Sequence, residues 1–199
     1  MAFQGVWGIP FLVQQYGISR FDASSKLLIM AIGLMIGCPL AGTISDKLSS
    51  RKWPLIVFTS LYISCWVLLT SWPGGKPSMD VLPFLFFAMG LFSSGFIIVW
   101  ACAKEVNAPH LSGCAMGLAN MGGFLGAAVM QPLFGWALDL NWDGTLVEGA
   151  RVYQLDAFRC AFLLLATVLV VTSFSLIFLK ETHAHPRVLH KPQRGVKNV

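Results

Sequence analysis

Charged side chains are scarce in this 199-residue sequence. Asp, Glu, Lys and Arg together make up only 12% of it, while hydrophobic residues make up 56% and the mean hydropathy is +0.69. Soluble domains carry about 25% charged residues, because charge covers a surface that faces water. The apolar residues here also fall into blocks of roughly 20, the length that a helix needs to cross the hydrocarbon core of a bilayer. The composition therefore excludes a soluble enzyme and predicts an integral membrane protein.

The residue patterns that carry enzyme chemistry are also missing. No Gly-rich phosphate loop precedes a Lys-Ser or Lys-Thr pair, which argues against an ATP-driven pump. No Ser/His/Asp or His/Cys group lies at membrane depth and no span has a charge at its centre, so we expect no enzyme, no cofactor and no buried proton carrier. No pair of cysteines has metal-ligand or redox spacing. We expect all five to be ordinary free thiols: Cys38, Cys65, Cys102, Cys114 and Cys160.

The two ends of the sequence differ in character. The first residues lack a basic leader and a small-residue cleavage site, so we expect no signal peptide. Residues 181–199 are basic and polar with two prolines, which predicts a disordered tail after a membrane domain over residues 1–180. His183, His185 and His190 of this tail have no acidic or Cys partner, so no metal site is expected there.

Charge and hydropathy divide the chain into membrane spans. A first segment over residues 2–16 is apolar but too short to cross a bilayer comfortably, and it is interpreted as the second half of a cut helix. Five complete spans are predicted after it, at residues 27–44, 53–72, 81–103, 112–138 and 157–179. The expected fold is therefore an all-α transmembrane bundle of about six spans, the first one partial.

The loops between these spans differ in their content of Lys and Arg. One set of alternate loops, taken with the tail, holds nine of the 14 Lys and Arg residues and the other holds five. The richer side is expected to be cytoplasmic, which places the C-terminus inside the cell. The net charge of +5 is then explained by membrane orientation, and no nucleic-acid partner is expected.

The turn between the first two complete spans has a distinctive pattern, Gly42-Thr-Ile-Ser-Asp46-Lys47-Leu-Ser-Ser-Arg51-Lys. One interpretation is a charged stop after an apolar helix. The positive-inside tendency asks only for Lys and Arg, however, and does not explain a Gly four residues before an Asp. The stretch resembles the signature loop of the major facilitator superfamily, Gly-x-Leu-small-Asp-Arg-x-Gly-Arg followed by Lys or Arg.

The match to the family pattern is incomplete. The chain departs from the family pattern at Ser49, where Gly is usual, and at Ser50, where Arg is usual. The resemblance implies that this loop latches the cytoplasmic side and steers exchange between conformations, with Gly42, Asp46, Lys47 and Arg51 as the gating residues. Because a helix N-terminus favours a carboxylate by roughly 0.3–1 kcal/mol, Asp46 is expected to cap the span that begins near residue 112 in one state and to release it in the other.

A second informative block lies in the span 112–138. Six of its residues follow helical spacing and share one face: Gly113, Gly117, Asn120, Phe124, Gln131 and Gly135. The glycines, Gly113 and Gly117, permit close packing of helices. Asn120 and Gln131 either bond to neighbouring helices or contact a solute, and both interpretations stay open. The block resembles the eleventh helix of the superfamily, which implies that Asn120, Phe124 and Gln131 line a central cavity.

Other spans supply further candidates. Gly33 and Gly37 form a Gly-x-x-x-Gly pattern, for which helix packing is the expected role. The resemblance places Gln4 and Trp7 on the seventh helix, which faces the cavity. It also places Trp100 near the cytoplasmic end of a tenth-type helix, where it is a further cavity candidate.

The resemblance covers nearly the whole chain as the C-terminal half of a superfamily member, with helix seven truncated. It implies secondary transport of a small solute by alternating access, in a bacterial inner membrane. The expected partners are the lipid bilayer, a small solute, a coupling ion, and a separate N-terminal half or a second copy of this chain. The alternative is a membrane fragment or interaction protein that transports nothing.

Overall fold

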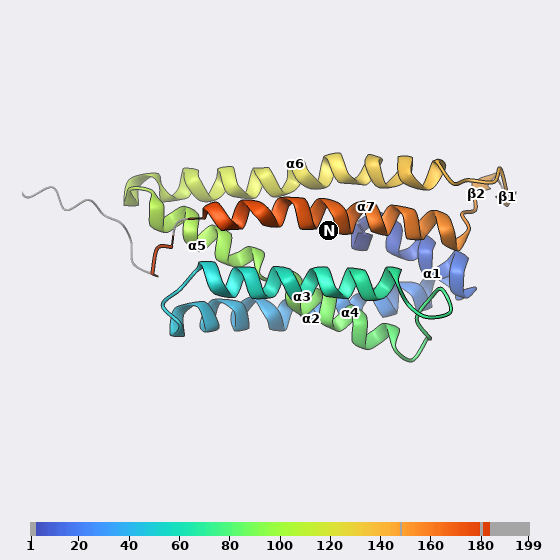
Figure 1. Ribbon diagram of the computed structural model, residues 1–199, viewed down its shortest axis with the longest axis horizontal. Coiled ribbons are helices and arrows are strands. Elements are labelled where there is room, and N and C mark those ends of the chain that lie inside the picture. The colour runs from blue at the N-terminus through green and yellow to red at the C-terminus, as the bar shows by residue number, and fades with distance from the viewer. Residues whose placement is uncertain (1–2, 148, 180, 184–199) are drawn as a thin grey trace, which may run out of the picture.

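The computed structural model describes residues 3–147, 149–179 and 181–183. Most of this part of the chain is helical, and the helices run along one long axis (Figure 1). Five helical segments are long and apolar enough to cross a membrane, which confirms the predicted all-α polytopic bundle. They are Arg20–Lys47, Lys52–Thr70, Leu82–Val106, Pro109–Asp139 and Leu155–Phe178. Most of the predicted tail, residues 184–199 with His185 and His190, lies outside the described residues.

The first segment is a short helix. A π-helical turn, η1 (Phe3–Trp7), continues into α1 (Gly8–Tyr16). The helix ends at Gly17, whose left-handed φ of 65° lets its N–H donate to the carbonyl of Val13. Residues 3–16 extend about 21 Å at 1.5 Å per residue, less than the roughly 30 Å of a bilayer core.

Helix α2 (Arg20–Lys47) begins seven residues before the predicted span at residue 27. Ser19 caps it, because its hydroxyl oxygen accepts a hydrogen bond from the N–H of Asp22 at 3.1 Å. Asp22 also lies in the first turn, where a carboxylate favours the positive end of the helix. Hydropathy detects the apolar middle of a span and misses such a polar start.

The predicted single span at residues 81–103 consists of two helices, α4 (Leu82–Ser93) and α5 (Phe96–Val106). At the break, the Ser93 hydroxyl donates to the Gly90 carbonyl and the Ser94 hydroxyl donates to the Leu91 carbonyl. Hydroxyls that bond back into a helix in this way often bend it. After the break, α5 packs against α6.

The remaining elements complete the bundle. Helix α3 (Lys52–Thr70) follows α2, and α6 (Ser112–Asp139) follows the 3-10 turn η2 (Pro109–Leu111). A two-stranded antiparallel hairpin of β1 (Leu146–Val147) and β2 (Ala150–Arg151) leads to α7 (Leu155–Ser173). The chain then narrows into a second 3-10 segment, η3 (Phe174–Phe178).

Interlocking aromatic rings fill the core. Phe3, Phe11 and Trp66 surround Phe162, each with ring centroids 5.0–5.6 Å from it. These rings come from η1, α1, α3 and α7, so one cluster joins segments that are far apart in sequence. Edge-to-face contacts of this kind add about 0.5–1.5 kcal/mol each beyond the burial of area.

The backbones of helices α2 and α4 approach each other closely. A Cβ placed on Gly90 would lie 2.0 Å from the carbonyl oxygen of Met30, and one on Gly33 would lie 2.3 Å from that of Phe87. A Cβ on Gly37 would lie 2.5 Å from the Leu91 carbonyl oxygen. Glycine is therefore what allows these two helices to cross.

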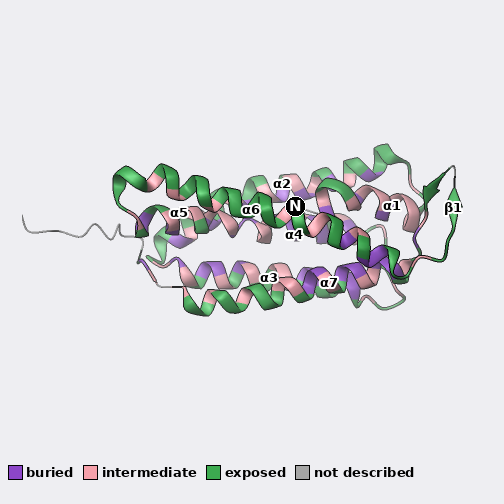
Figure 2. Cartoon of the chain, turned by 90° about the horizontal axis from the view of Figure 1, so that it is seen from above, coloured by how far each residue is buried: buried purple, intermediate pink, exposed green. Residues whose placement is uncertain are grey.

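Helix α6, by contrast, is little buried. It is largely exposed along its length (Figure 2), and none of the most apolar window of its span is buried. A Cβ added to Gly113 or Gly117 would meet nothing within 4 Å. The expected packing of these two glycines is not found within the described chain, because their face of α6 is open.

Candidate functional site

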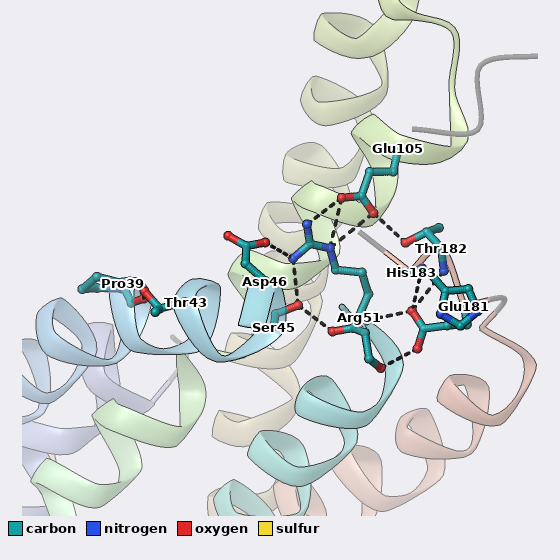
Figure 3. Close-up of polar contacts among 10 residues, drawn as sticks. Pro39, Thr43, Ser45, Asp46, Arg51, Glu105, Glu181, Thr182 and His183 are labelled. Carbon is teal, nitrogen blue, oxygen red and sulfur yellow. Dashed lines mark hydrogen bonds and ion pairs between the residues drawn. The ribbon is translucent and has the colours of Figure 1, made fainter. Parts of the chain in front are cut away.

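The helix ends and the α2–α3 turn at one end of the bundle carry Lys47, Arg51, Lys52 and Lys104, and we call this the basic end. The hairpin lies at the other end (Figure 1). At the basic end a group of polar side chains surrounds one arginine (Figure 3). We call it the Arg51 cluster, and its members are Ser45, Asp46, Ser50, Arg51, Glu105, Glu181 and Thr182.

Arg51 is the centre of this cluster. Its Nη2 donates to Glu105 Oε1 at 2.6 Å, and its Nε donates to both carboxylate oxygens at 3.1 and 3.3 Å. Its Nη1 donates to Asp46 Oδ1 at 2.7 Å and to the Ser45 hydroxyl at 2.8 Å. Fork-shaped contacts of this kind suit the planar guanidinium and are stronger than neutral hydrogen bonds.

The two carboxylates that meet Arg51 differ in burial. The side chain of Glu105 is 11% exposed and that of Arg51 is 9% exposed, while that of Asp46 is 66% exposed. The pKa of Arg51 is raised above its usual value, mainly by the hydrogen bond to Glu105 and despite burial, so the guanidinium stays charged. The Arg51–Glu105 pair is thus the protected part of the cluster, and Asp46 is the part that water reaches.

The local backbone turns Arg51 inward. Helix α2 ends at Lys47, and Ser49 then adopts a left-handed φ of 46°. The Ser45 hydroxyl donates to the Ser50 carbonyl at 2.8 Å and closes the turn. Ser49 occupies the position at which the signature loop described above usually has Gly. The left-handed conformation supplies a physical reason for that preference.

Glu181 joins the segment after η3 to the start of α3. Its carboxylate accepts from the backbone N–H groups of Arg51 and Lys52 at 2.7 and 3.1 Å, and from the Ser50 hydroxyl at 2.6 Å. The Thr182 hydroxyl in turn donates to Glu105 Oε2 at 2.5 Å. No side chain of α3's own N-cap position bonds to its first turn, so Glu181 supplies the missing cap from the other end of the sequence.

The pKa of Glu181 reflects these contacts. Burial alone would raise it, but the hydrogen bonds from Arg51 N–H, Ser50 and neighbouring N–H groups outweigh burial and lower it to about 2. A carboxyl whose folded pKa lies below its unfolded value stabilises the fold above the unfolded pKa. That contribution is lost as the pH falls from the ordinary range near 4.5 toward 2.

This pH dependence leads to a first prediction. The amide N–H groups of Arg51 and Lys52 should stay protected from hydrogen exchange down to about pH 4 and lose protection at lower pH, after correction for intrinsic rates. In Glu181→Gln the same two amides should exchange faster already at neutral pH. Equal exchange in both proteins would show that Glu181 does not cap α3. Amides in the middle of α3 serve as the internal control.

The four residues assigned to the gating loop have different places. Asp46 and Arg51 meet in the cluster, whereas the exposed Lys47 side chain forms no hydrogen bond in the described chain and a Cβ added to Gly42 would meet nothing within 4 Å. Helix α6 starts without a side-chain cap, so Asp46 does not cap it in this state. Glu105 and Glu181 were not among the predicted site residues, although each is an isolated acid at the edge of an apolar span.

The structure does not bring all of the predicted cavity residues together. Trp7 and Gln131 meet, because the Trp7 indole N–H donates to the backbone carbonyl of Gln131 at 3.3 Å while the Trp7 ring stacks on Phe134. Gln4 is half-buried in η1. Asn120 and Phe124 are exposed on α6. Trp100 lies on α5 edge-to-face with Phe96, and the structure does not bring it together with Trp7.

At the other end, the hairpin is fastened to α1 and α6. Tyr153 donates its hydroxyl to Asp139 at 2.7 Å, and its backbone bonds to both Gln14 and Gln15. Arg151 forms an ion pair with Asp139 at 2.7 Å. A cleft of about 420 Å³ lies beside this hairpin, lined by Trp7, Pro10, Gln14, Arg20, Arg151 and Tyr153 among others. Each end of the bundle thus has its own set of hydrogen bonds and ion pairs that join different segments.

The described part of the chain holds no candidate metal-binding group. No group of three or more His, Cys, Asp or Glu side chains there is placed to hold an ion. The chemistry that the Arg51 cluster offers is the making and breaking of charged contacts between α2, α3, α5 and the segment after η3.

Comparison with known proteins gives the family. The chain is 26% identical over 156 residues to the membrane sensor protein UhpC of Escherichia coli (strain K12), a match that covers 71% of this chain and 33% of that protein. The chain thus spans about a third of the length of this curated relative. The family model of the Major Facilitator Superfamily matches residues 1–198. With its polytopic helical fold, the chain therefore belongs to the Major Facilitator Superfamily.

Proposed function

We propose that this chain forms the C-terminal half of a secondary transporter that moves a small solute by alternating access, with the Arg51 cluster as the latch of the basic end. The family supports transport as the general function. The cluster supports the latch, because it joins four segments through contacts that can break without unfolding any helix. Asp46 is 66% exposed whereas Glu105 is 11% exposed, so we expect the Arg51–Asp46 contact to open before the Arg51–Glu105 contact.

The observation that carries the proposal is the open face of α6. None of the apolar window of its span is buried, yet the exposed Asn120 lies eight residues inside the start of this helix. A polar side chain at that depth is costly in lipid unless it meets protein or water. We infer that this face meets a second six-helix unit, either a separate N-terminal half or a second copy of this chain, across a solute pathway. Superfamily members bind solutes between two such halves.

A sensor is the second candidate function. The matched relative is named a membrane sensor protein, and it is about three times as long as the matched part. A sensor would use the same latch to report solute binding but would move no solute. The third possibility, a fragment that only packs against other membrane proteins, has no solute-dependent change at all.

The proposal predicts that water reaches the side chain at position 120. Asn120→Cys, in a background in which exposed Cys114 is replaced by Ser, should react with a membrane-impermeant thiol reagent in vesicles. Val171→Cys, an exposed position on α7, is the matched control and should stay unreactive in lipid. Adding Asp46→Asn should raise the reactivity of the thiol at position 120 toward a reagent applied on the side of the basic end. The expected increase is about two- to fivefold, the size expected from the loss of one exposed ion pair.

The outcomes separate the candidates. An introduced thiol at position 120 that is unreactive from both sides would exclude a water-filled pathway and leave only the packing fragment. Reactivity that a solute changes, followed by uptake of that solute into proteoliposomes, supports a transporter. The same solute-dependent change without uptake supports a sensor. Reactivity that Asp46→Asn leaves unchanged would remove the latch.

A further inference from the structure

A second, smaller groove lies on the outside of the bundle between α3 and η3, near the basic end. It has a volume of about 210 Å³. Its lining is apolar except for three hydroxyls, and comprises Ile56, Thr59, Ser60, Ser173, Phe174, Leu176 and Ile177. The groove opens where α7 narrows into the 3-10 segment η3.

One side of the groove is a single stripe of α3. Lys52, Ile56, Thr59 and Ser60 are spaced three and four residues apart, so they lie on one face of the helix. The Lys52 ammonium reaches across to η3 and donates to the carbonyl of Ile177 at 2.6 Å. A positive charge is thereby held at the mouth of an apolar groove.

The groove lining includes two hydroxyls of α3, those of the half-buried Thr59 and the exposed Ser60. Neither Thr59 nor Ser60 has a hydrogen bond from its hydroxyl within the described chain, whereas Ser64 on the same helix bonds back to the Ser60 carbonyl and Ser173 bonds back to Val170. Unpaired hydroxyls in a low-dielectric surrounding cost free energy. A ligand with acceptor oxygens at this depth would satisfy them.

The spacing of these groups matches a phospholipid. Thr59 is seven residues beyond Lys52, about 10 Å along the helix axis. The headgroup region of one leaflet is about 5–8 Å thick, so an anion bound at Lys52 places the ester oxygens of its lipid near Thr59 and Ser60. Trp53, 67% exposed next to Lys52, is a residue type found at the same interface.

We propose that this groove binds one anionic phospholipid from the leaflet at the basic end. Its phosphate pairs with Lys52, its ester oxygens accept hydrogen bonds from Thr59 and Ser60, and one acyl chain lies along Phe174 and Ile177. Basic pockets between membrane helices commonly hold anionic headgroups. The carboxylate of Glu181 accepts hydrogen bonds from the backbone N–H groups at the start of α3 and from the Ser50 hydroxyl.

Native mass spectrometry of the full chain tests the proposal. Released from micelles doped with equal amounts of phosphatidylglycerol and phosphatidylcholine of identical chains, the protein should retain one phosphatidylglycerol about fivefold more than phosphatidylcholine. Lys52→Gln should abolish this preference, and Lys52→Arg should keep it. Ser60→Phe, which fills the groove, should reduce the retention of both lipids.

Controls make each result decisive. Lys104→Gln removes an exposed charge at the same end of the bundle without touching the groove, and should leave the preference unchanged. Circular dichroism of each variant verifies its helical content. Equal retention of both lipids by the wild-type chain, or an equal loss in Lys104→Gln, would overturn the proposal. Displacement of the lipid by millimolar glycerol 3-phosphate would do so as well, because it would reveal a site for free phosphate.

Discussion

Replacing Arg51 with Leu should lower the free energy of unfolding of the chain in detergent by about 3 kcal/mol. The substitution leaves the carboxylate of Glu105, only 11% exposed, without its charged partner, and an unpaired buried charge costs about 3–5 kcal/mol. The lower end of that range applies, because the Thr182 hydroxyl still donates to Glu105. The measurement is an SDS titration followed by circular dichroism.

A double variant shows whether the charge or the packing matters. Arg51→Leu combined with Glu105→Leu should be more stable than Arg51→Leu alone, since replacing both members of a buried pair with apolar residues is often neutral. Lys47→Leu, which removes an exposed charge from the same turn, should change stability by less than about 0.5 kcal/mol. If Arg51→Leu is as stable as the Lys47 control, the cluster does not hold the basic end together.

The second large effect is expected at the crossing of α2 and α4. Gly90→Ala should destabilise the chain by about 3 kcal/mol, because its Cβ would lie 2.0 Å from the Met30 carbonyl oxygen and 3.0 Å from the Leu34 nitrogen. These are backbone atoms of α2, so relief requires the whole helix to move. The same detergent titration measures the loss.

Gly117→Ala is the matched control, and its outcome depends on the partner. In the chain alone, a Cβ at Gly117 meets nothing within 4 Å, so the change should be neutral or stabilising by up to about 1 kcal/mol. When the proposed second half is present, the same change should weaken their association. Loss of stability in the chain alone would contradict the open face of α6.

Hydropathy predicted the five spans because each needs roughly 20 apolar residues, a property that the sequence carries directly. It missed the start of α2, which depends on the Ser19 cap, and the break between α4 and α5. The break occurs inside a continuous apolar stretch, where hydropathy does not change.

Glycine spacing illustrates what a single sequence leaves open. Gly33 and Gly37 lie against α4, whereas Gly113 and Gly117, with the same spacing, face open space. A Gly-x-x-x-Gly pattern indicates that another helix can approach closely. Which helix does so depends on the tertiary arrangement.

The Arg51 cluster was only partly predictable for a similar reason. Asp46 and Arg51 are five residues apart and belong to one turn, so the pattern of the loop indicated both. Glu105 and Glu181 are 54 and 130 residues away from Arg51 in sequence, and only the folded bundle brings them to it.

The open face of α6 has a thermodynamic consequence for the chain. A surface that covers this helix adds binding free energy that the isolated polypeptide lacks, and such energy follows mass action. If the proposed second half is that surface, the melting temperature of this chain will depend on the density of second halves in the membrane. Dilution of both into excess lipid should then lower the stability of this chain although no residue and no solvent condition has changed.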